Sequence, residues 1–252
     1  MSIMPAADPS FTSLEAFAAF GVIAVAAFLV TWVVTGLLHV KRMPYIAILA
    51  LLAVGLTAGY LVWSGTTMSD LLSSGWGWGI FAGVVAAAVV TPGVRRLPAG
   101  TRHVPGRAAG MFVWEAGVYG VAEALLLATL PVLAVWQGAV AAGWTETTWG
   151  TVGSGALAMA GAFLVILVHH LGYDEFRRSK EKLGGALAGC GVQAFAFLVT
   201  GCALAPVIAH IVLHVQLIRR GIELPPAEGI RPATRDEGRR AITPGRPVVA
   251  TR

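Results

Sequence analysis

The residues in this sequence best suited to chemistry are two histidines within an apolar segment. His210 and His214 are four residues apart in the stretch 204–220, whose apolar residues predict a helix. At this spacing the two imidazoles lie one turn apart on the same helical face. Because polar rings are costly in hydrocarbon, such a pair inside a membrane segment indicates a functional site. The alternative interpretation is that both rings only make hydrogen bonds that hold helices together.

Two other apolar segments carry side chains that can complete a site. Glu115 and Glu123 lie in one segment, and His169 and His170 end another. A carboxylate as deep among apolar residues as Glu123 must be paired or protonated, so Glu123 is the preferred acid. Glu115 stays a candidate because its depth, counted along the helix, matches that of the histidines better. We expect the three segments to meet inside a helical bundle.

The composition identifies the class of protein. The chain has 252 residues, of which 56% are hydrophobic and 12% are charged, and its mean hydropathy is +0.74. Soluble domains carry about 25% charged residues, so the sequence predicts an all-α integral membrane protein. Cys190 and Cys202 lie in one predicted helix, and their separation of ~18 Å along it is too great for a disulfide bond.

Seven apolar segments predict a polytopic bundle of about seven transmembrane helices. A helix needs about 20 residues to cross a bilayer. The seventh segment is too short to cross alone, so it is tilted, re-entrant or continuous with the arginines that follow it. The segments are Ser13–Val40, Pro44–Trp63, Gly77–Val94, Ala108–Trp136, Thr151–Leu171, Leu183–Leu204 and Pro206–Ile218.

The basic residues predict how these helices are oriented. All 18 lysines and arginines follow the first, third, fifth or seventh segment, which places them in alternate loops. Under the positive-inside rule the N-terminus lies outside, and the basic loops and the C-terminus lie in the cytoplasm. We therefore predict a multi-pass protein of the plasma membrane. The chain divides into a three-span region with a basic loop (1–107), a helical core (108–220) and a basic tail (221–252).

The tail is rich in proline, glycine and arginine, and we expect it to be disordered. Its charge can contact anionic lipid, so the bilayer is an expected partner. No aromatic residues alternate with these basic residues, so we expect no binding to nucleic acid. No P-loop, Rossmann or HExxH motif supports a nucleotide-binding or zincin-type protein.

Three motifs, in order along residues 113–220, resemble those of the CPBP family of intramembrane proteases, which includes the CAAX endopeptidases. That family is marked by EExxxR, then FxxxH, then HxxxN or HxxxD. Ala122–Ala128 is similar to the first motif, with Glu123 as its leading glutamate. Ile166–His170 is similar to the second, with isoleucine for phenylalanine, and Leu204–His214 is similar to the third.

The chain departs from these motifs at three positions. Ala124 and Ala128 stand where the family has its second glutamate and its arginine, and His214 stands where it has asparagine or aspartate. Glutamate and arginine four residues apart could form an ion pair on one helical face. Their joint replacement therefore leaves no unpaired charge, which fits a diverged member.

The resemblance implies an intramembrane endopeptidase in which Glu123, with Glu115 as the alternative, takes a proton from water. His170, His210 and His214 would hold the water, bind a metal ion or stabilise the oxyanion. Three imidazoles and a carboxylate also match a tetrahedral zinc site, and the sequence favours neither a metal-dependent nor a metal-free mechanism. The implied substrate is a peptide or membrane protein, cleaved at a site that opens to the cytoplasm.

Other functions stay open. Replacement of the second glutamate and the arginine is also typical of a non-catalytic scaffold or partner protein that keeps the fold. His169 or His170, together with His214, could ligate a b-type haem from two helices. A glutamate–histidine pair could also couple protons in a transporter, although the sequence has no internal repeat that supports this function.

Overall fold

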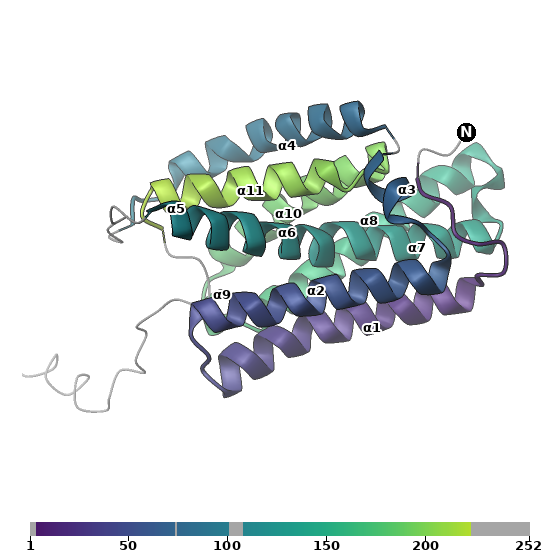
Figure 1. The fold of residues 1–252 in the computed structure, drawn as a ribbon. Helices are drawn as coiled ribbons and strands as arrows, with labels where there is room; N and C mark the ends of the chain where they lie inside the picture. Colours follow the sequence, from purple (N-terminus) through teal and green to yellow (C-terminus); the bar gives the residue numbers. More distant parts are fainter. Residues whose placement is uncertain (1–3, 74, 101–107, 223–252) are drawn as a thin grey trace, which may run out of the picture.

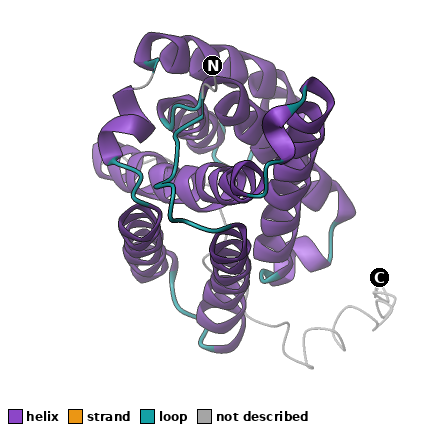
Figure 2. Ribbon diagram, turned by 90° about the vertical axis from the view of Figure 1, so that its right-hand side faces the viewer, coloured by secondary structure: helices purple, strands orange, loops and turns teal. Residues whose placement is uncertain are grey.

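The computed structural model describes residues 4–73, 75–100 and 108–222, and its long helices lie side by side in one bundle (Figure 1). No strand occurs in these residues, so the all-α prediction is confirmed for them; Figure 2 shows only helices and loops. The long helices are α1 (Ser13–Thr31), α2 (Arg42–Ser64), α4 (Trp76–Arg96), α7 (Leu130–Ala141), α8 (Thr148–Leu171), α10 (Lys180–Thr200) and α11 (Leu204–Arg219). Shorter helical segments are η1 (Trp32–Leu37), α3 (Met68–Ser73), η4 (Trp144–Glu146) and α9 (Asp174–Arg177).

Six helical stretches are long and apolar enough to cross a membrane, and they coincide with the first six predicted segments. The seventh segment forms α11, an apolar helix of 16 residues. Large apolar side chains cover the outer faces, and Leu51 and Val62 are 75% and 85% exposed, as expected for faces that contact lipid. The six stretches are Ser13–Leu37, Arg42–Ser64, Trp76–Arg96, Ala109–Ala141, Thr148–Leu171 and Lys180–Thr200.

The fourth of these stretches is the central helix of the bundle. It joins α5 (Ala108–Met111), η2 (Phe112–Val118), α6 (Tyr119–Glu123), η3 (Ala124–Thr129) and α7 without a break. Of the 18 most apolar consecutive residues in this stretch, 83% are buried, whereas the corresponding share in the other five stretches is 33–39%. Its side chains therefore face protein rather than lipid. Residues of α1, α2, α8 and α10 share one hydrophobic core with it.

Local sequence signals explain where several helices begin and end. Thr12 caps α1, because its hydroxyl accepts from the Glu15 N–H while the Glu15 carboxylate accepts from the Thr12 N–H. Gly65 ends α2 and Gly201 ends α10, with φ of 68° and 65°. These left-handed conformations favour glycine, which has no Cβ.

The described basic residues gather at one end of the bundle, called here the basic end (Figure 1). Lys41 follows the first helical stretch, Arg96 ends α4, Arg178 follows α9 and Arg219 ends α11. A hydrogen bond joins the end of α11 to the end of α4. The Arg220 guanidinium donates to the Leu97 carbonyl oxygen at 2.5 Å. The predicted basic loop continues into residues 101–107, and the tail into 223–252; both ranges lie outside the described residues.

Close helix contacts hold α4 against α11. A Cβ on Gly83 would lie 2.9 Å from the carbonyl oxygen of Ala205, and a Cβ on Gly79 would lie 2.6 Å from Cys202 Sγ. Small residues allow such close approach of helices in a membrane. The contact fixes the position of α11, which carries the two histidines four residues apart.

Candidate Glu–His site

Glu123 is the last residue of α6, between two π-helical segments. η2 precedes α6 and η3 follows it, and both belong to the central helix. π-helical turns inside α-helices occur frequently at functional sites. Each such turn rotates the residues after it relative to a regular helix, so the direction of Glu123 does not follow from the spacing of 3.6 residues per turn.

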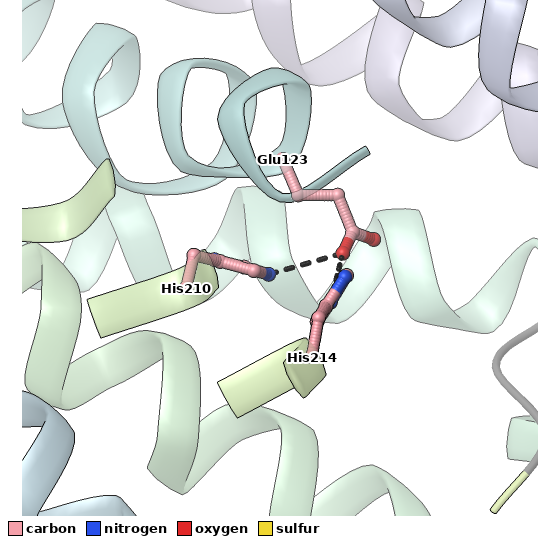
Figure 3. A group of neighbouring side chains, drawn as sticks. All are labelled: Glu123, His210 and His214. Atoms are coloured by element: carbon pink, nitrogen blue, oxygen red, sulfur yellow. Dashed lines mark hydrogen bonds and ion pairs between the residues drawn. The ribbon is translucent and has the colours of Figure 1, made fainter. Parts of the chain in front are cut away.

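Three imidazoles surround the Glu123 carboxylate. His210 Nε2 lies 3.0 Å and His214 Nε2 lies 3.2 Å from Oε2, and Figure 3 shows both rings pointing from α11 at the carboxylate. On the other oxygen, Oε1, His169 Nε2 lies at 3.5 Å. All four residues are buried, with exposed fractions of 0–5%. Ligand atoms of Glu123, His210 and His214 lie within 4.8 Å of one another, close enough to hold one metal ion.

The three segments predicted to meet do meet, and helix packing explains how. Gly120 is one turn before Glu123, and a Cβ at this glycine would lie 3.4 Å from the backbone of Ile211. α11 therefore packs directly on α6, and the spacing of four residues turns both of its histidines to the same side. His169 comes from the last turn of α8.

Backbone carbonyl groups orient two of the imidazoles. His214 Nδ1 lies 2.8 Å from the Glu115 carbonyl oxygen, and His169 Nδ1 lies 3.0 Å from the Ala27 carbonyl oxygen. A carbonyl oxygen only accepts hydrogen bonds, so each Nδ1 carries the proton. In the neutral ring Nε2 then has a lone pair, and this lone pair faces the Glu123 carboxylate. Histidines that bind metal ions are commonly oriented by such a bond from the other ring nitrogen.

Two of these contacts therefore place one lone pair against another. Lone pairs on two Nε2 atoms face carboxylate oxygens at 3.2 and 3.5 Å, which is repulsive between a carboxylate and neutral imidazoles. A hydrogen-bond donor, a shared proton or a metal ion between these groups removes this repulsion. His210 differs, because its Nδ1 has no hydrogen-bond partner among the described residues, and its Nε2 can either donate to the carboxylate or present a lone pair.

Glu115 and His170, the other predicted site residues, lie beside this cluster with different partners. The Glu115 carboxylate lies 3.5 Å from Arg42 Nη1, and its backbone carbonyl accepts a hydrogen bond from His214 Nδ1. His170 Nδ1 lies 2.8 Å from the Ile166 carbonyl oxygen on its own helix, and its ring packs on Phe176 at 4.7 Å. The position against Glu123 that the sequence analysis assigns to His170 is occupied by its neighbour His169.

Three tyrosines that the sequence analysis does not select complete the surroundings. The Tyr173 hydroxyl lies 3.4 Å from His169 Nε2, and it also contacts the hydroxyls of Tyr45 and Tyr119. Helical spacing carries a signal for two of them, because Tyr119 is four residues before Glu123 and Tyr173 is four residues after His169. Residues at this spacing lie on one helical face.

Comparison of the chain with models of protein families, with curated proteins and with solved structures finds no match. The assignment of a function therefore depends on the geometry of Glu123 and its histidines.

Proposed function

We propose that this chain is a multi-pass membrane hydrolase of peptide bonds, in which Glu123 activates the attacking water. One observation carries the proposal: side chains from three separate segments of the sequence converge on the single carboxylate of Glu123. These are the segments whose motifs resemble the CPBP proteases. A buried carboxylate among imidazoles has the groups needed for general base catalysis.

Each residue has a role in the proposed reaction. Glu123 takes a proton from water while the water oxygen attacks the peptide carbonyl carbon, and the same proton passes to the amine nitrogen when the C–N bond breaks. The water donates one O–H to Glu123 and the other to the Nε2 lone pair of His214, while His169 lies against the other carboxylate oxygen. His210, whose Nδ1 makes no other bond, donates from Nε2 to the oxyanion.

The proposed orientation places the N-terminus outside the cell and the basic end in the cytoplasm. The described lysines and arginines next to the ends of α1, α4, α8 and α11 lie at the same end of the bundle (Figure 1), which fits the positive-inside rule. In this arrangement α11 is the seventh span. His214 is five residues before the end of α11, so we propose that the site opens to the cytoplasmic side of the plasma membrane.

Hydrolysis in ¹⁸O-labelled water tests the proposal. The wild type and Glu123→Gln, each in lipid nanodiscs, are incubated with a library of synthetic peptides that carry apolar membrane anchors, and with detergent-extracted membrane proteins. We expect the wild type to give products with ¹⁸O in the new carboxyl terminus, and Glu123→Gln to give none. Glu146→Gln, the same change at an exposed glutamate, is the control and should match the wild type. Absence of labelled products from the wild type, or equal labelling by Glu123→Gln, would reject the proposal and favour a scaffold.

A second candidate function is the binding of a divalent metal ion, zinc being the best match to these ligands. The orientation of His169 and His214 by backbone carbonyls favours it. Glu123, His210 and His214 would hold the ion, with His169 as a fourth ligand, and a bound zinc ion would lower the pKa of a bound water. Elemental analysis of protein purified without chelators should give about one zinc per chain, and less in His210→Ala. A wild type that contains no metal and takes up none from added zinc would exclude this candidate.

The geometry does not favour the haem alternative. The carboxylate of Glu123 lies between His169 and His214, in contact with both rings. A porphyrin held by this pair would have to occupy the same space, so we do not propose a haem protein.

A further inference from the structure

Three tyrosine hydroxyls meet on one side of the Glu–His site, and we name them the tyrosine cluster. Tyr45 lies in the first turn of α2, Tyr119 begins α6, and Tyr173 follows α8. The Tyr173 hydroxyl oxygen lies 2.5 Å from that of Tyr45 and 3.2 Å from that of Tyr119. All three side chains are buried, with exposed fractions of 0–1%. Burial of a hydroxyl in an apolar bundle is unfavourable unless it is hydrogen-bonded, so their arrangement is specific.

The cluster contacts the site through both of its flanking histidines. Tyr173 OH lies 3.4 Å from His169 Nε2, and the Tyr119 ring packs against the His214 ring at 5.0 Å. His169 Nδ1 donates to the Ala27 carbonyl oxygen, so the neutral ring can only accept at Nε2. The Tyr173 O–H is therefore the donor in its contact with His169.

This assignment fixes the direction of the remaining hydrogen bonds. A phenol has one O–H donor, and its oxygen accepts from others. Because Tyr173 donates to His169, its oxygen accepts from Tyr45 at 2.5 Å and is available to Tyr119. The Tyr45 phenol thus orients Tyr173, which in turn contacts an imidazole at the carboxylate.

We propose that Tyr173 is a positioning residue that holds His169 in its Nδ1–H form with Nε2 turned to Glu123. The inference rests on the proposed function, in which His169 lies against the Glu123 carboxylate that takes the proton. Removing a residue that hydrogen-bonds a side chain of the site typically changes activity by about 10–100-fold. Tyr45 acts one step further away, by holding the Tyr173 hydroxyl.

A spectroscopic experiment tests the inference without relying on hydrolysis. The chain contains six histidines, so ¹⁵N-histidine labelling gives a small set of ring signals in detergent micelles. Loss of one set of signals in His169→Gln identifies those of His169. In Tyr173→Phe we expect the ¹⁵N chemical shift of His169 Nε2 to move toward the value of a ring nitrogen that accepts no hydrogen bond. The change removes the hydroxyl and keeps the ring, which packs against His169 at 5.4 Å.

Tyr60→Phe is the matched control. Tyr60 is also buried, at 4% exposed, and its hydroxyl donates to Gln137 at 2.6 Å, away from the Glu–His site. The same loss of one buried hydroxyl should leave the His169 signals unchanged. Thermal unfolding of both variants shows whether each is folded. If Tyr173→Phe does not fold, Tyr45→Phe replaces it, with a smaller shift of the same sign expected.

The outcomes for the two proposals are distinguishable. If the wild type hydrolyses a peptide, Tyr173→Phe should lower kcat about tenfold with little change in KM, and Tyr60→Phe should change neither. If the wild type hydrolyses nothing, the proposed function fails, while the NMR result still decides whether Tyr173 orients His169. An unchanged His169 Nε2 signal in the folded tyrosine variant would overturn the inference.

Discussion

The buried ion pair of Arg42 and Glu115 gives a prediction whose size follows from the structure. Arg42 Nη1 lies 3.5 Å from Glu115 Oε2, and each side chain is 1% exposed. Arg42→Leu removes the guanidinium from a carboxylate that stays buried. Loss of one partner of a buried pair costs about 3–5 kcal/mol, largely because the remaining charge is left in an apolar environment. For a chain of this size, that loss lowers the melting temperature by roughly 6–20 °C.

The double variant Arg42→Leu/Glu115→Leu distinguishes this cause from loss of packing. Replacing both partners by apolar side chains removes the buried charge together with its partner, so most of the lost stability should return. Thermal unfolding of the wild type, both single variants and the double variant in the same detergent measures the coupling free energy. Arg178→Leu, at a side chain that is 78% exposed, is the control and should shift the free energy of unfolding by less than about 0.5 kcal/mol. The reasoning fails if Arg42→Leu is as stable as the control, or if the double variant is as unstable as the sum of the single ones.

Four further substitutions test the site and its packing. His214→Asn restores the residue type of the resembling motif, so we expect peptide hydrolysis to be kept while zinc content falls; loss of hydrolysis together with zinc would indicate a metal-dependent mechanism. Gly83→Ala should destabilise the protein by about 1–3 kcal/mol, because the added Cβ overlaps the backbone of α11. Gly59→Ala, with no atom within 4 Å of the new Cβ, should not lower the melting temperature. Tyr60→Phe should cost about 0.5–1.5 kcal/mol through the hydrogen bond lost to Gln137, with unchanged activity.

Much of the fold could be predicted from the sequence, because length and apolar composition determine membrane helices almost without tertiary information. The first six predicted segments coincide with the six helical stretches. The pair His210 and His214 could be placed on one face for the same local reason, since the geometry of a single α-helix determines it. The meeting of three segments at Glu123 needed the resemblance of their motifs as well as their composition.

The sequence alone could not decide between His169 and His170, or between Glu115 and Glu123, because local helix geometry does not determine which of them faces the site. His169 and His170 differ in direction by about 100° around the helix, and both are buried, with 0% and 6% exposed. Which ring faces Glu123 depends on how α8 is rotated against the central helix. The choice between Glu115 and Glu123 depends on η2 and η3, whose π-helical turns change the direction of side chains within the central helix.

The depth of Glu123 shows why counting along helices misjudges such a site. The bond from His214 to the Glu115 carbonyl brings this turn of α11 beside Glu115, and Glu123 lies ~12 Å further along the central helix. Side chains, however, lean toward the N-terminus of their own helix. The central helix starts at the basic end and α11 ends there (Figure 1). Glu123 therefore leans toward the basic end while His210 and His214 lean away from it, and their polar atoms meet between the two levels. In this antiparallel pair of helices, the lean of the side chains compensates for the offset of their Cα atoms, which is how Glu123 rather than Glu115 meets the two histidines.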